Sequence, residues 1–296
     1  MLFCNCTERR QGTVLNLIFQ NTMTGLMAIG LGLVAHEAAA SQVMTYRSCL
    51  AIVEDNPVAG FSSAFLWHQG GGGASAQHCM ALALIGQGEY AQAAQLLEDA
   101  ARAVGKQAGA ASQMTQLLSQ AGNAWLMDEN GAQAYELFNE ALQRRGMANG
   151  IRAELWVDRA RANAALQDFS AALEDLNAAV SLVGLRSDIL VFRASAYRML
   201  ENVDRAQEDI ERALQLRPNN PEALHERGNL KFALGDVAEA HADWQKVVDV
   251  APNSVTAQLA KRNLSEIDDA LMRAEATETI PKTRPDLAPA QQTPVE

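Results

Sequence analysis

Small and bulky side chains recur every 34 residues through the second half of this chain. The repeated segments are 153–186, 187–220 and 221–254. Numbered from 1 within each segment, position 8 is Ala or Gly and position 20 is always Ala. Position 24 is bulky and apolar, as Leu176, Ile210 and Trp244. The spacing predicts two helices per segment, with small residues where they touch and a large residue that fills the gap between them.

Polar residues and helix breakers divide each segment at fixed places. Position 16 carries a short polar side chain suited to a turn and a helix start, as Asp168, Asn202 and Asp236. Position 32 stops the second helix, as Gly184, Pro218 and Pro252. The segments 74–107 and 115–148 carry the same markers. We therefore predict five helical hairpins that must stack, because one hairpin cannot bury its apolar face alone.

The pattern resembles the tetratricopeptide repeat family, whose motif has a small residue at position 8, Ala at 20 and Pro at 32. The chain departs from the family at position 11, which is aromatic only at Tyr197. The resemblance implies an all-α, right-handed superhelical solenoid of antiparallel helix pairs. It also implies a concave groove that holds a protein or peptide partner, and it does not imply catalysis.

In this family, positions 2, 5, 9 and 12 of the first helix point into the groove. Carried over to this sequence, the candidate partner-binding residues are Asn123, Arg161, Arg198, His225, Asn229 and Phe232. The lysines that grip a terminal carboxylate in some members are absent, since position 5 is His, Ser or Val in all five segments. The alternative for each candidate is a solvated helix face without a ligand.

A charged pair recurs with the repeat. Position 7 is Arg159, Arg193 and Arg227, and position 23 is Asp175, Asp209 and Asp243. We interpret these residues as ion pairs that cross each hairpin; the alternative is an arginine ladder for an acidic ligand. In the first two hairpins both positions are apolar together: Met80 with Leu96, and Ala121 with Leu137. This joint exchange indicates that positions 7 and 23 touch.

Residues 1–40 are typical of an export signal. A short charged region ends at Arg10, an apolar stretch runs from Met23 to Ala35, and small residues precede Ser41. We predict cleavage near Ala40–Ser41 and a periplasmic protein. The alternative is an uncleaved anchor in the inner membrane that faces the periplasm, which would be the only membrane contact.

Export would remove Cys4 and Cys6 and leave Cys49 and Cys79 in an oxidising space. Three interpretations stay open. The two thiols form a disulfide, or they remain free and buried, or they bind a metal together with His68 and His78. The spacing matches no common zinc pattern.

Three further segments flank the repeats. Residues 41–73 are expected to form a helical pair broken at Asn56-Pro57, a degenerate first repeat that ends in a flexible joint at the glycine run 70–73. Residues 255–276 have helical spacing and are expected to cap the stack. Residues 277–296 are rich in Pro and poor in large apolar residues, which predicts disorder.

Charge and motifs limit the function. The net charge of −11, without a basic run, argues against a nucleic-acid partner. We find no catalytic, cofactor or metal motif. We therefore expect a non-enzymatic scaffold that binds a protein or peptide in the cell envelope. The alternative is a structural subunit of an envelope complex that uses the convex face or the N-terminal helices; an accessory domain of a degenerate hydrolase has no residue evidence.

Overall fold

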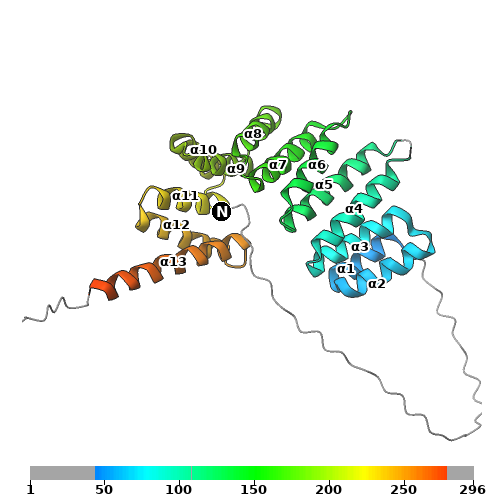
Figure 1. Cartoon of the computed structure of the whole chain (residues 1–296), viewed down its shortest axis with the longest axis horizontal. Helices are drawn as coiled ribbons and strands as arrows, with labels where there is room; N and C mark the ends of the chain where they lie inside the picture. The colour runs from blue at the N-terminus through cyan, green and yellow to red at the C-terminus, as the bar shows by residue number, and fades with distance from the viewer. Residues whose placement is uncertain (1–43, 108, 279–296) are drawn as a thin grey trace, which may run out of the picture. The chain divides into compact units, whose positions relative to one another are not determined.

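The computed structural model of the chain describes residues 44–107 and 109–278, and regular structure in these ranges is entirely helical (Figure 1). The chain divides into two compact units between Leu182 and Val183. The first unit holds α1 (Tyr46–Asp55), α2 (Pro57–Trp67), η1 (His68–Gly72), α3 (Gly73–Gln87), α4 (Tyr90–Val104), α5 (Ala111–Met127), α6 (Gly131–Leu142), α7 (Asn149–Ala165) and α8 (Phe169–Val183). The second holds α9 (Ser187–Met199), α10 (Val203–Leu216), α11 (Pro221–Ala233), α12 (Val237–Val250) and α13 (Val255–Glu278).

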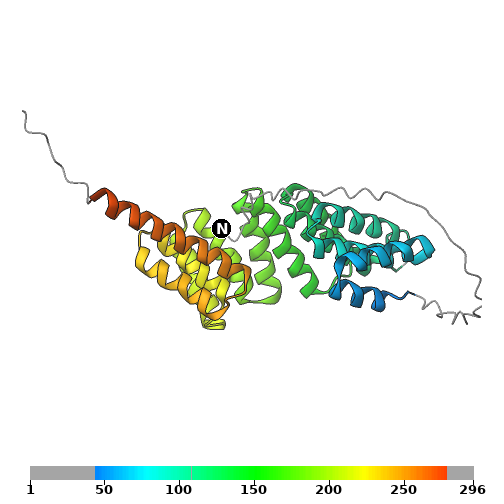
Figure 2. The ribbon, with the colours of Figure 1, turned by 90° about the horizontal axis from the view of Figure 1, so that it is seen from below.

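Each predicted 34-residue segment contains one antiparallel helix pair, and the all-α repeat fold is confirmed. We call the first helix of each pair helix A (α3, α5, α7, α9 and α11) and the second helix B. Within each unit, consecutive helices pack side by side (Figure 2). The five hairpins are divided between the two compact units. The division falls at the end of α8, where Gly184 has a left-handed φ of 79°.

The turn between helices A and B has the same backbone in all five hairpins. Position 15 takes a positive φ in Gly88, Glu129, Gln167, Glu201 and Gly235. The next residue caps helix B: the side chains of Asn130, Asp168 and Asn202 each accept a backbone N–H from three residues further on. Because a left-handed residue followed by a cap reverses the chain at once, helices A and B lie close together along their length.

Small residues occupy the line where helices A and B touch. At position 8 these are Ala81, Gly122, Ala160, Ala194 and Gly228, and at position 20 they are Ala93, Ala134, Ala172, Ala206 and Ala240. All of them are buried. A Cβ added to Gly122 would lie 2.6 Å from the Phe138 ring, and one added to Gly228 would lie 2.5 Å from the Trp244 indole. The bulky residue at position 24 therefore fills the space that the small residues leave.

The glycine run after α2 is not an open joint. The backbone continues from Trp67 through a π-helical turn into α3, with a kink at Gly71, where φ is 94°. A Cβ at Gly72 would lie 2.8 Å from the Trp67 ring. The run differs from the expectation because glycine is needed here for a left-handed kink and for close packing.

Two predicted segments fall largely outside the described residues. The export signal at 1–40 lies wholly outside them, and the predicted tail lies outside them from residue 279 onward, since α13 extends to Glu278. Within 44–107 and 109–278, no helix has both the length and the hydropathy required to cross a membrane.

We expect that replacing Ala240 by Leu will lower the free energy of unfolding by about 1–3 kcal/mol, because the contact line has no room for a larger side chain. Ala242→Leu on the same helix is the matched control, since Ala242 is exposed. Urea unfolding of both variants measures the difference. Equal stability of the two variants would contradict the packing.

Candidate protein-binding surface

The three repeated ion pairs cross their hairpins from helix A to helix B. Arg159 donates to Asp175 at 2.6 and 3.0 Å, and Arg193 donates to Asp209 at 2.7 Å through two nitrogens. Arg227 donates to Asp243 at 2.5 and 2.8 Å. All three aspartates are buried. These arginines are therefore part of the hairpin framework, which disfavours a ladder for an acidic ligand.

The electrostatics of Asp243 illustrate the pairing. Burial alone would raise its pKa, but hydrogen bonds from Arg227 and Lys231 hold the pKa below its usual value. In the first two hairpins the paired positions are packed apolar side chains instead: Met80 lies with Leu96, and Ala121 and Leu137 belong to one core cluster. Two physically different pairs thus occupy the same place in different hairpins.

Two candidate binding residues lie together between α5 and α7. Asn123 donates to Asp158 at 3.0 Å and accepts from Arg161 at 2.8 Å. Arg161 also pairs with Asp158 at 3.0 Å. Burial raises the pKa of Asp158, while Arg161 and Asn123 oppose that rise. Sequence reasoning missed Asp158, which joins the two candidates into one polar cluster.

A second cluster joins α9, α11 and α13. Arg198 donates to the buried Glu226 at 2.6 Å, and Asn229 donates to the same carboxylate at 3.2 Å. The amides of Asn229 and Asn263 lie 3.3 and 3.4 Å from the two ring nitrogens of His225. The candidates Arg198, Asn229 and His225 therefore belong to one internal network.

His225 was expected on an open face and is instead only 1% exposed. The reason is α13, whose Asn263 covers it. Burial, with the nearby Arg198 cation, lowers the pKa of His225 to about 3. The imidazole is therefore neutral near pH 7 and does not offer a charge to a partner. Phe232, in contrast, is 49% exposed and packs one ring edge near Trp244 at 5.7 Å between centroids.

Position 6 of helix A links successive A-type helices, and sequence comparison missed this role. Gln120 hydrogen-bonds His78 on α3, Asp158 accepts from Asn123 on α5, and Glu226 accepts from Arg198 on α9. Position 6 of the first hairpin is Cys79, and it forms a disulfide with Cys49 on α1. The signal was hidden because no single residue type recurs at position 6, which is Cys79, Gln120, Asp158, Phe192 and Glu226 in the five segments.

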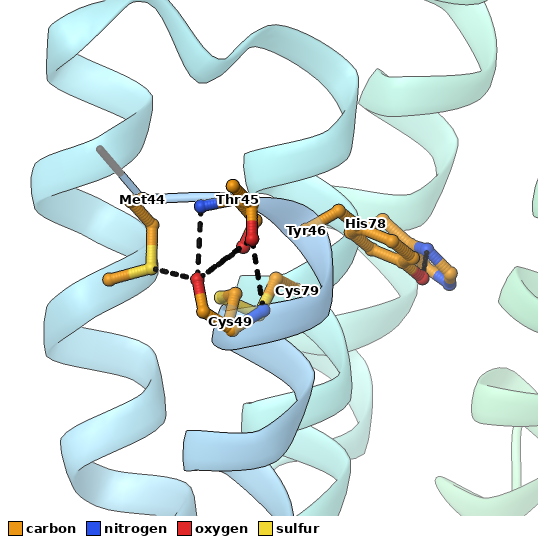
Figure 3. Close-up of a disulfide and its surroundings, with 7 residues drawn as sticks. Met44, Thr45, Tyr46, Cys49, His78 and Cys79 are labelled. Carbon is orange, nitrogen blue, oxygen red and sulfur yellow. Dashed lines mark hydrogen bonds between the residues drawn. A yellow bond between two sulfur atoms is a disulfide. The ribbon is translucent and has the colours of Figure 1, made fainter. Parts of the chain in front are cut away.

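The disulfide is the first of these links and is buried beside Tyr46 and His78 (Figure 3). The Tyr46 hydroxyl hydrogen-bonds the His78 ring at 2.7 Å. Of the three interpretations of the cysteine pair, the structure contains the disulfide, so neither free thiols nor thiolate metal ligands are present at Cys49 and Cys79. Closing the loop between Cys49 and Cys79 contributes about 3–4 kcal/mol to stability in the chain-entropy model.

His68 and His78 do not assemble with other ligands. Within the ranges that the structure describes, no cluster of three or more His, Cys, Asp or Glu side chains is arranged to hold a metal ion. His78 instead bridges Tyr46 and Gln120, and burial lowers its pKa. His78 is therefore one of the polar side chains that link successive A helices.

Comparison with known proteins agrees with the repeat geometry. The tetratricopeptide repeat family matches residues 193–265, from α9 into α13. Residues 193–265 are therefore tetratricopeptide repeat (TPR) sequence. No curated protein has a matching sequence.

Solved TPR structures share the fold at low sequence identity. A putative kinesin light chain of Podosopora anserina, with nearly identical TPR-like repeats, is 22% identical, with a TM-score of 0.50 over 59% of this chain and 92% of that one. A TPR protein of Thermus thermophilus is 19% identical (TM-score 0.49; 64% and 98% covered). MamA from Desulfovibrio magneticus is 17% identical (TM-score 0.48; 62% and 97%). These likenesses concern the fold alone.

The TPR hairpin of α9 and α10 offers a direct test of the ion pairs. Replacing Arg193 by Met leaves the buried Asp209 uncompensated and is expected to cost about 3–5 kcal/mol. The double change Arg193→Met with Asp209→Leu installs the residues that hairpin 74–107 already has, and it should cost less than Arg193→Met alone. Denaturant unfolding of the full cycle measures this coupling. If the double variant loses as much unfolding free energy as the two single variants added together, the coupling between the two positions is refuted.

Acid should destabilise the second unit through His225. The folded pKa of about 3 lies below the unfolded value near 6.5, so the unfolded state binds more protons between these two values. The contribution of neutral His225 to the free energy of unfolding is fully present above about pH 6.5. The free energy of unfolding should fall by about 3 kcal/mol by pH 4. The His225→Gln variant should lose much less over the same interval. Urea unfolding of both proteins at pH 7, 5.5 and 4 checks this, and parallel pH profiles would be the contrary result.

Proposed function

We propose that this TPR protein is a non-enzymatic scaffold that binds a protein or peptide through the exposed faces of its A helices. One observation carries the proposal. Large apolar side chains remain exposed at positions 12 to 14, the C-terminal end of helix A and the first turn residue, in four hairpins. These residues are Met127, Leu166, Met199, Leu200, Phe232 and Leu234, and they are between 42% and 51% exposed.

Scattered apolar side chains on a surface are ordinary, but recurrence at one place in the repeat is not. Within a hairpin, these side chains lie about one helical turn from position 9, where Asn123, Arg161 and Asn229 are partly exposed polar groups. Apolar contacts beside partly exposed hydrogen-bonding groups are the composition of a protein-binding surface. Of the expected binding residues, Phe232 fits this role best, while Arg198 serves to hold Glu226 in place.

We further propose that the scaffold works in the periplasm. The apolar stretch from Met23 to Ala35 supports export, and the disulfide between Cys49 and Cys79 suits an oxidising compartment. Fractionation of cells with N-terminal sequencing tests this proposal. A soluble periplasmic chain that begins at Ser41 is expected. An intact N-terminus in the inner membrane would favour the anchor, and a full-length cytosolic chain with free thiols would contradict export.

A second candidate is a structural subunit of an envelope complex that docks through its N-terminal helices. The observation in its favour is a stripe on α2, where Val58 is 62% and Leu66 is 67% exposed. Phe65 extends the stripe and stacks on Phe61 at 6.4 Å between ring centroids. No charged residue lies on α2, so the stripe has no ionic selectivity.

Site-specific photo-crosslinking in cells separates the two candidates. A benzophenone side chain at Met199 or Leu234 should give adducts with one partner, because these positions line the proposed surface. The same group at Gln207 or Gln245, which are exposed on helices B, is the matched control and should give none. Adducts from Leu66 without adducts from the A helices would overturn the scaffold proposal and favour the second candidate.

A further inference from the structure

The A helices of the first two hairpins carry no Asp, Glu, Lys or Arg. Neither α3 nor α5 contains one, although 20% of the whole chain is charged. The B helices of the same hairpins do not share this composition, since α4 carries Glu98, Asp99 and Arg102 and α6 carries Glu136 and Glu140. Charge is therefore absent from α3 and α5, as it is from α2, whereas α4 and α6 of the same unit are charged.

The remaining ionisable group on these two helices is also neutral. His78 lies between Tyr46 and Gln120, and burial lowers its pKa, so the ring carries no charge near pH 7. The hydrogen bond from His78 to Gln120 joins α3 to α5, so the His78 face of α3 and the Gln120 face of α5 lie near one another.

Amide and apolar side chains line this surface. Gln116 is exposed, Asn123 is half-buried, and Leu82, Ile85 and Leu126 are partly exposed. Met127 is exposed at its edge. The amide of the exposed Gln116 both donates and accepts hydrogen bonds, so it suits the N–H and C=O groups of an extended peptide backbone, whereas the amide of Asn123 already bonds Asp158 and Arg161. The apolar side chains between the amides suit apolar side chains of that peptide.

The border of the surface at α7 is also balanced in charge. Asp158 and Arg161 pair at 3.0 Å, and Asn123 bonds to both. The A helices of the second unit differ, because α9 carries Asp188 and Arg198, and α11 carries Glu222 and Lys231. The contrast within one chain shows that the TPR fold itself does not require uncharged A helices.

We infer that the A-helix face of the first unit, formed by α3 and α5, binds an extended, uncharged peptide segment with apolar side chains. This inference rests on the proposed scaffold function and names its partner class. A charged side chain that docked here would lose water and gain no counter-ion, which is unfavourable. An uncharged segment incurs no such cost and buries Met127 and its apolar neighbours.

A synthetic peptide array tests the selectivity. The probes are eight-residue peptides with blocked termini: one set has no ionisable side chain, and matched copies have a central Lys or Glu. The disulfide-bonded chain should bind members of the uncharged set at least tenfold more tightly than their charged copies, as measured by titration calorimetry of the best binders.

Variants of one exposed residue place the binding on this surface. Gln116→Lys should lower the affinity for the best uncharged peptide at least fivefold. The same change should raise the affinity for the copy of that peptide that contains Glu. Gln95→Lys is the matched control, because Gln95 is exposed on helix B of the first hairpin, and it should leave both affinities unchanged. Circular dichroism verifies that both variants fold.

The outcomes separate this inference from the scaffold proposal. Equal affinity for charged and uncharged peptides, with sensitivity to Gln116→Lys, would overturn the uncharged specificity and leave the scaffold in place. No binding, or binding insensitive to Gln116→Lys, would overturn the inference for the first unit. The crosslinking at Met199 and Leu234 would still decide the scaffold function independently.

Discussion

The close approach of helix A to helix B is the constraint on which the rest of the structure depends. Small residues at positions 8 and 20 bring the two backbones together, and the residue at position 24 occupies the space between them, as Phe138 does against Gly122. Because the helices meet along this buried line, each hairpin presents one face of helix A outward. In four hairpins, large apolar side chains at positions 12 to 14, near the end of helix A, remain exposed.

Contacts between successive A helices add a second layer of order. The same position supplies a disulfide at Cys79, an amide at Gln120 and carboxylates at Asp158 and Glu226. Burying a carboxylate is costly unless hydrogen bonds and a cation compensate it, as Arg198 and Asn229 do for Glu226. We expect such buried ionic links to fix the register between hairpins more than they add stability. The candidates Arg198 and His225 therefore make contacts inside the structure, with Glu226 and Asn263.

The repeat spacing predicted the helix pairs, the buried alanines and the residues that form the crossing ion pairs, because each depends on contacts within one 34-residue segment. Contacts between segments were not predictable in the same way. Position 6 is a carboxylate only in the third and fifth segments, as Asp158 and Glu226, so no residue type recurs there through the five segments. His225 is buried by Asn263 of α13, which lies after the last repeat. The uncharged composition of α3 and α5 was readable in the sequence, but its meaning required the hydrogen bond from His78 to Gln120 that joins the two helices.

Amide hydrogen exchange on the chain, alone and bound to the partner recovered by crosslinking, tests the central claim most directly. The account predicts that binding slows exchange in A helices such as α5 and α11 and leaves the paired B helices α6 and α12 unchanged. Slowed exchange confined to α2, or equal in helices A and B, would contradict the claim that the A-helix faces are the working surface.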